Sequence, residues 1–103
     1  MTDREMLELA ARAAGIVVTD DMRELWLHVG SSAWNPRTDD GDALRLAVYL
    51  EFEIDITSTG VAVRTRCGLK VLVNKTEEPD LCAAARLAIT RAAAEIGRQM
   101  EET

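Results

Sequence analysis

Apolar residues recur at helical spacing in three separate segments of the chain. In the first segment, residues 2–14, leucine, methionine and alanine gather on one side of a helix. Thr2 and Glu5 have the spacing of a capping box, in which the hydroxyl accepts from the N–H of Glu5 and the carboxylate reaches back. Gly15 is suited to ending this helix, because glycine tolerates the left-handed conformation. We expect a first helix over residues 2–14.

Two later segments show the same spacing. From Asp42 to about Leu50 the apolar residues form a wide face, which predicts a helix of about three turns. A long alanine-rich helix is expected to begin near Pro79, which suits a first helical position because it has no N–H to leave unpaired. Gly97 lies late in this helix and is expected to weaken it mildly. The buried stripe of the long helix is predicted to contain Leu81, Ala85, Ala88, Ile89, Ala92, Ile96 and Met100.

Three segments in the middle of the chain, residues 51–57, 61–67 and 69–75, alternate between apolar and polar residues. Turn-forming residues at 58–60 and at Gly68 separate them, which predicts a three-strand antiparallel meander with one apolar and one charged face. The apolar face is expected to carry Phe52, Ile54, Ile56, Val61, Val63, Thr65, Val71 and Val73. The other face is expected to carry Glu51, Glu53, Asp55, Arg64 and Arg66.

Residues 23–29 also alternate, which favours a further half-buried strand, with a short helical turn as the alternative. A β-branched run at residues 16–18 precedes this segment, and glycine and serine at 30–32 follow it as a loop. The predicted fold is α+β in a single domain over residues 1–103. It contains a small antiparallel sheet of three to four strands in a meander, covered on one face by two to three helices. The alternative is a three-layer sandwich, in which both sheet faces are covered.

The charged sheet face has two interpretations. Acidic residues on the first strand of the meander lie across from arginines on the second, and such cross-strand pairs contribute about 0.2–1 kcal/mol each. We favour a lattice of ion pairs that faces solvent, and a partner surface is the alternative.

The net charge narrows the classes of partner. The 103 residues include 18 acidic and 12 basic side chains, and the formal charge of −6 argues against a general nucleic-acid binder, which needs a basic face. This charge is compatible with docking on a basic partner. Four of the first ten residues are charged, and no apolar run approaches the ~18–20 residues of a membrane span, so we expect a cytoplasmic protein without a membrane partner.

Residues with catalytic or metal-binding chemistry are sparse. His28 is the only histidine, and Cys67 and Cys82 are the only cysteines, which does not supply the paired ligands of a zinc site. We expect both cysteines to be small core residues, with a reactive thiol at Cys82 near a helix start as the alternative. No phosphate-binding glycine loop or nucleophile motif occurs. We assign no catalytic residue, metal or cofactor, and an enzyme is not favoured.

The stretch 34-WNPRTDDGDALRLAV-48 has the most unusual composition in the chain. Its acidic residues are explained by helix initiation, with Asp39 or Thr38 as the N-cap and Asp42 reaching back in the manner of a capping box. The tryptophan at its start has two interpretations: Trp34 plugs the core, or it forms half of a binding notch. The candidate binding residues are Trp34, Asn35, Asp39, Asp40 and Asp42, with Trp26 nearby in sequence.

The residues from Trp34 to Val48, together with 85-ARLAITRAAAEIGR-98, resemble small uncharacterised proteins of tailed bacteriophages and prophages. These proteins are similar to what has been called the phage alpha-beta-alpha sandwich domain. The resemblance covers two blocks, about a third of the chain, and implies a source and a fold type without a chemistry. It implies the host cell cytoplasm as the location.

Two hypotheses of different classes follow. The first is a non-enzymatic phage or prophage accessory protein that binds a host or phage protein, either as an anti-defence inhibitor or as a regulatory adaptor. The second is a small-molecule or nucleotide-binding domain, in which Trp34 stacks on a base and the neighbouring carboxylates hold a cation. A structural homo-oligomer that covers the free sheet face is a third interpretation.

Overall fold

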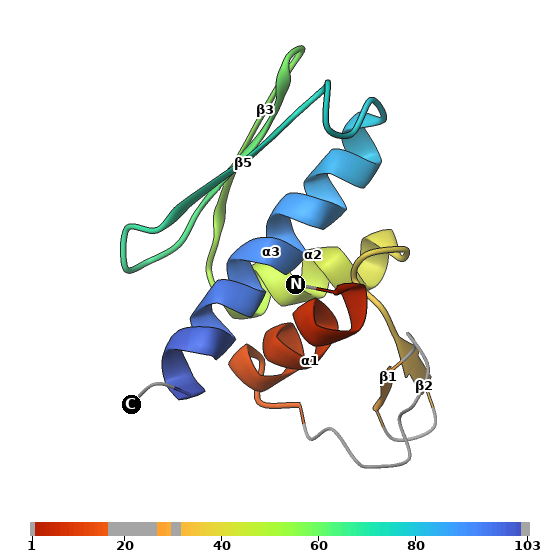
Figure 1. Cartoon of the computed structure of the whole chain (residues 1–103), viewed down its shortest axis with the longest axis vertical. Helices are drawn as coiled ribbons and strands as arrows, with labels where there is room; N and C mark the ends of the chain where they lie inside the picture. Colours follow the sequence, from red (N-terminus) through yellow and green to blue (C-terminus); the bar gives the residue numbers. More distant parts are fainter. Residues whose placement is uncertain (1, 17–26, 30–31, 102–103) are drawn as a thin grey trace.

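The computed structural model describes residues 2–16, 27–29 and 32–101. Within these ranges the chain forms three α-helices and five β-strands (Figure 1). In chain order the elements are α1 Asp3–Ala13, β1 Leu27–Val29, β2 Ser32–Trp34, α2 Asp40–Tyr49, β3 Glu53–Thr57, β4 Gly60–Arg64, β5 Lys70–Asn74 and α3 Leu81–Glu101. No helix in this part of the chain is long and apolar enough to cross a membrane.

Strands β3, β4 and β5 form an antiparallel sheet in that order, and β1 and β2 form a separate two-stranded ribbon. Helix α3 runs across β4 and β5, while α1 and α2 both pack on α3 (Figure 1). The sheet is therefore an outer layer, and no described helix covers its second face. The α+β prediction with a three-strand meander is confirmed, and helices on both sheet faces, the alternative, are not found among the described elements.

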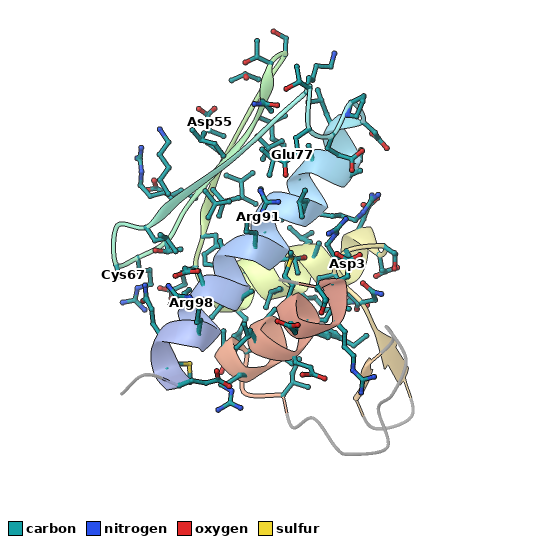
Figure 2. The ribbon with its side chains drawn as sticks, in the orientation of Figure 1. Asp3, Asp55, Cys67, Glu77, Arg91 and Arg98 are labelled. Carbon is teal, nitrogen blue, oxygen red and sulfur yellow. The ribbon has the colours of Figure 1, made fainter. Side chains whose placement is uncertain are left out.

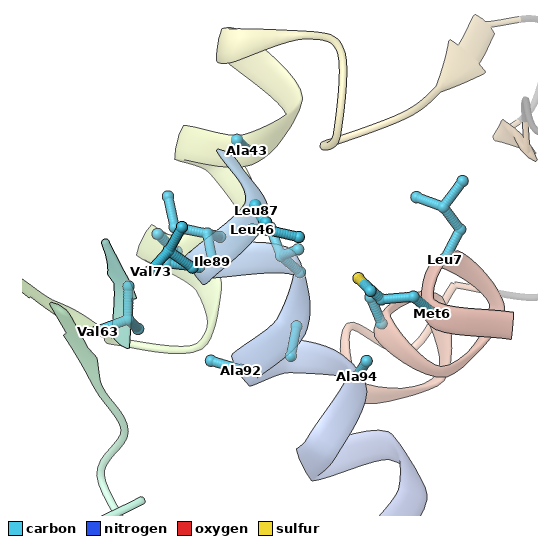
Figure 3. Close-up of a cluster of buried hydrophobic side chains, with 14 of the residues drawn as sticks. Met6, Leu7, Ala43, Leu46, Val63, Val73, Leu87, Ile89, Ala92 and Ala94 are labelled. Carbon is cyan, nitrogen blue, oxygen red and sulfur yellow. The ribbon is translucent and has the colours of Figure 1, made fainter. Parts of the chain in front are cut away.

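The hydrophobic core lies on both sides of α3. Figure 3 shows Val63 and Val73 of the sheet on one side of this helix and Met6 and Leu7 of α1 on the other. Because the sheet and α1 cover α3 from two sides, its buried residues occupy more of the helix surface than a single stripe. Of the predicted stripe, Ala88, Ile89 and Ala92 are buried, but Met100 is 50% exposed. The stripe missed the buried residues Ala84, Leu87, Thr90, Ala93, Ala94 and Gly97.

Gly97 marks the closest approach between α1 and α3. A Cβ built on Gly97 would lie 1.9 Å from the backbone oxygen of Leu9 and 2.7 Å from its carbonyl carbon. Because both atoms belong to the backbone, they cannot turn aside as a flexible side chain would. The expectation that Gly97 only weakens the helix is therefore wrong: the missing side chain lets the two helices touch.

The helix starts agree with the sequence in one case and are shifted in another. Thr2 caps α1, and its hydroxyl accepts from the N–H of Glu5 at 3.1 Å, as predicted. Helix α3 begins at Leu81 and not at Pro79. The Asp80 carboxylate accepts from the N–H of Cys82 at 3.0 Å, so a side-chain cap at Asp80, and not Pro79, begins the helix.

The predicted strand over residues 23–29 is described only from Leu27 onward. Its last three residues form β1 and pair with β2 in the register Leu27–Trp34. This pairing places the strand in the ribbon rather than in the meander. Residues 23–26 of the predicted strand and residues 17–18 of the β-branched run lie outside the described residues.

Candidate functional site

The tryptophan that opens the stretch 34–48 is buried. Trp34 is 7% exposed and belongs to the hydrophobic core, and the neighbouring Asn35 is 3% exposed. This burial favours the core plug over the notch. It also removes Trp34 as the exposed ring on which a base would stack in the nucleotide hypothesis.

Asn35 organises the approach to α2 through its backbone and its side chain. Its N–H donates to Asp42 Oδ2 at 2.9 Å, and its carbonyl accepts from the N–H groups of Thr38 and Asp39 at 3.2 and 3.0 Å. Its side-chain oxygen accepts from the N–H of Arg37 at 3.0 Å. These hydrogen bonds satisfy buried polar groups at the start of α2, so a structural role explains why an asparagine occupies position 35.

The acidic residues of this stretch initiate α2. Asp39 is the N-cap, as one of the two predicted candidates, and accepts from the N–H of Asp42 at 2.8 Å. The predicted reach of Asp42 back to Asp39 is wrong. Its carboxylate instead accepts from Asn35 and from the Arg45 guanidinium, the latter at 2.7 Å. The difference arises because the chain before the cap folds back over the first turn of the helix.

Arg86 of α3 links the segment before α2 to the rest of the fold. Its Nε donates to the carbonyl of Arg37 at 2.9 Å, and its Nη1 donates to Asp40 Oδ1 at 2.6 Å. Arg37 in turn pairs with Asp3 of α1 at 3.1 Å. The stretch is therefore a junction that holds three helices together.

The predicted binding residues divide by accessibility. Trp34, Asn35 and Asp42 are buried, whereas Asp39 and Asp40 are exposed. Trp26 lies outside the described residues. The binding role of these six residues stays a prediction, and the structure adds a structural role for the three buried ones.

A groove of about 360 Å³ lies beside this junction, between α2, β3 and α3. Its walls include Ala43 and Leu44 of α2, Ile54 and Ile56 of β3, and Ala85 and Ile89 of α3. Its charged members, Asp40 and Arg86, form an ion pair with each other. The groove is therefore apolar and electrically neutral. Of the predicted site residues, it contains Asp40.

The groove exists because β3 extends beyond the helix that covers the sheet. Ile54 and Ile56 pair with Val63 and Val61 of β4 and share their face. The two valines are buried beneath α3, but the isoleucines are 37% and 58% exposed, since α3 packs on β4 and β5. The expected burial of the apolar side of this strand is therefore wrong at its edge.

Helix α2 also presents apolar residues outward. Leu44 is 60% exposed and Val48 is 68% exposed, and they lie one turn apart. The wide apolar face of this helix is therefore only partly buried, through Ala43, Leu46 and Ala47. A face too wide for one contact surface is the pattern that could have indicated the groove.

The opposite sheet face carries the predicted ion pairs. Arg64 pairs with Glu53 at 3.4 Å and Arg66 pairs with Glu51 at 2.9 Å, which confirms the cross-strand lattice. Asp55 lies across from Ala62 and has no ion pair among the described residues. Figure 2 shows Asp55 on the side of the sheet away from α3. One acidic side chain of the edge strand is thus free to meet a cation.

Both cysteines are exposed, which contradicts their expected place in the core. Cys67 lies in the turn between β4 and β5, where a hydrogen bond with the Thr65 hydroxyl and a second with the backbone of Leu69 lower the pKa of its thiol (Figure 2). Cys82 lies in the first turn of α3 and lines the groove. The alternation pattern could not show that the first lies in a turn and the second on the open side of a helix.

The described residues contain no group of three or more histidine, cysteine or carboxylate side chains placed to hold a metal ion. Comparisons with known proteins add no assignment: no family model, curated protein or solved structure matches the chain.

Proposed function

We propose that the chain is a non-enzymatic protein-binding module that holds its partner in the groove between α2, β3 and α3. The observation that carries this proposal is the group of exposed apolar side chains, Leu44, Ile54 and Ile56, around one neutral groove. Contiguous apolar surface of this kind is a common mark of interaction sites, because water contact with it is unfavourable.

The resemblance of residues 34–48 to small tailed-phage proteins supports a phage or prophage accessory protein, acting as an anti-defence or regulatory factor on a host or phage protein. In this proposal the stretch contributes indirectly. Its buried residues fix the start of α2, and that helix then presents Ala43 and Leu44 to the groove. Its exposed Asp40 holds Arg86 beside the groove.

The test compares two lysine substitutions on the same sheet. Ile56 is 58% exposed in the groove, and Leu72 is 63% exposed on the opposite face, so I56K and L72K add the same charge at positions of equal accessibility. Both should fold with little change in stability, since exposed substitutions usually shift it by within about 0.5 kcal/mol.

Affinity-tagged parent, I56K and L72K proteins are recovered from infected or lysogenic cells, and bound proteins are quantified by mass spectrometry. We expect a stoichiometric partner with the parent and with L72K, and its loss with I56K. A partner retained by I56K, or the absence of any stoichiometric partner across several hosts, refutes the proposal.

A further inference from the structure

The backbone of β3 has a free hydrogen-bonding edge. In β4, the N–H of Thr65 donates toward β5, to the carbonyl of Leu69 at 2.8 Å. Because successive residues of a central strand turn their backbone groups to opposite neighbours, the backbone groups of Ala62 face β3. The backbone groups of its partner, Asp55, are therefore used in pairing with β4. The backbone groups of Ile54 and Ile56 therefore point away from the sheet. None of the described residues donates to them or accepts from them across that edge.

The two edges of the sheet differ in their chemistry. At the β5 edge the outward positions include Lys70, and Lys75 follows directly after the strand. Lysine at a sheet edge discourages the addition of another strand. At the β3 edge the outward positions are Ile54 and Ile56, and their side chains enter the groove. The β3 edge has no lysine at these outward positions, and it is also the edge that adjoins the apolar groove.

The polar side chains of β3 determine which charge is favourable in a strand that pairs with it. Between the two isoleucines and before them, Asp55 and Glu53 project to the charged sheet face. A strand paired with β3 places its own alternate side chains on each face in step with these residues. Apolar side chains would then lie over Ala85 and Ile89 in the groove, while the others would lie beside the two carboxylates.

A second copy of this chain is disfavoured as the paired strand. Two β3 strands related by a two-fold axis set Asp55 against the partner's own carboxylates on the polar side. Like charges directly opposite each other destabilise a strand pair. A basic strand instead finds opposite charge at Asp55, which has no ion pair of its own among the described residues, whereas Glu53 already pairs with Arg64.

We propose that the partner of the groove is an extended polypeptide segment of alternating apolar and basic residues, which adds to the sheet as a fourth strand beside β3. The inference rests on the proposed function, and it specifies the conformation and charge of the partner segment. Backbone hydrogen bonds to Ile54 and Ile56 would provide affinity, and the alternate side chains would provide specificity.

The test uses four synthetic peptides and the full chain labelled with ¹⁵N. The first alternates lysine and valine, and the second replaces each lysine by glutamate. The third is the first peptide with alternate backbone nitrogens methylated on its pairing edge. The fourth has the same composition as the first but is ordered so that its apolar residues repeat at helical spacing. Binding is followed by NMR shifts, and amide exchange is measured at Ile54 and Ile56.

We expect the first peptide to slow exchange of the Ile54 and Ile56 amides about tenfold at a concentration of roughly ten times its Kd. The acidic and methylated peptides should bind at least about tenfold more weakly, as should the first peptide to I56K but not to L72K. No binding by the first peptide at several times 1 mM overturns the inference.

Three other outcomes also overturn the strand inference. They are equal binding of the acidic peptide, slow exchange of both amides in the free protein together with a dimer in sedimentation equilibrium, and occupation of the groove by the helical peptide without protection of β3. The last outcome refutes the strand inference but is compatible with the proposed function. A partner retained by I56K in cells refutes the proposed function as well.

Discussion

Replacing Gly97 by alanine tests the packing of α1 on α3. In an isolated helix this change is favourable by about 1 kcal/mol, because alanine has the higher helix propensity. Here the new methyl would lie 1.9 Å from the Leu9 oxygen, and ordinary contacts between heavy atoms lie near 3.5 Å, so α1 must retreat by roughly 1.6 Å. A gap of about 0.5–1 Å already forfeits a quarter to a half of the dispersion energy of a contact, so this retreat forfeits at least that share across the interface.

The expected net effect is a loss. Overpacking typically costs about 1–3 kcal/mol, and a block between two backbones belongs at the upper end of that range. After the gain in propensity we expect G97A to lower the free energy of unfolding by about 2 kcal/mol, which lowers Tm by roughly 8–16 °C for a domain of this size. Urea denaturation and thermal melts followed by circular dichroism measure both quantities.

Gly41 provides the matched control, because it is also a helical glycine. A Cβ at Gly41 would lie 3.2–3.3 Å from the flexible end of the Arg45 side chain and 3.2 Å from Asp39 Oδ2, the cap oxygen of α2, so these side-chain atoms need shift by only a few tenths of an ångström and no backbone atom is in the way. We expect G41A to be neutral or stabilising by up to about 1 kcal/mol. If G97A is as stable as the parent, or if the two variants behave alike, the close approach of α1 and α3 is refuted.

Three further predictions concern the junction and an ion pair. W34A should cost about 3–5 kcal/mol in a denaturation experiment, because it empties a large core site, and a near-neutral result would contradict the plug. D42A should cost about 1–3 kcal/mol by leaving the Asn35 N–H without its acceptor, and D42N, which keeps an oxygen, should cost less. The hydrogen bond and charge of Arg91 lower the pKa of Glu77 from its ordinary 4.5, so this stabilisation is complete above that pH and lost as the pH falls through the lower folded-state pKa. The stability difference between parent and E77Q should therefore shrink below about pH 4.5 in parallel denaturation curves, and a difference independent of pH would contradict the assignment.

The local periodicity determined most of the fold. Alternation located the three strands of the meander within three residues, and the charged pairs Arg64–Glu53 and Arg66–Glu51 formed as the facing of the strands required. Caps were predictable where one side chain serves one backbone group, as at Thr2. These features depend on neighbours within a few residues, which a single sequence contains.

Features that depend on several elements together were not predictable. Gly97 appeared to be a defect because its partner, Leu9, lies at the other end of the chain. The exposure of Ile54 and Ile56 was not predictable, because alternation indicates which face a residue occupies, but not whether a helix extends far enough to cover it. The groove was missed for the same reason.

The central claim is that a partner protein occupies the groove between α2, β3 and α3, and the two cysteines allow it to be tested in one measurement. Cys82 is exposed in the groove, and Cys67 is exposed in the turn between β4 and β5. The lowered pKa of the Cys67 thiol favours its reactive thiolate, so this residue reports reagent activity independently of the groove. The rates at which N-ethylmaleimide alkylates both thiols are compared in the free protein and in the complex with the recovered partner. We expect saturating partner nearly to abolish alkylation of Cys82 and to leave that of Cys67 unchanged. Unaltered alkylation of Cys82 in the saturated complex would contradict the central claim.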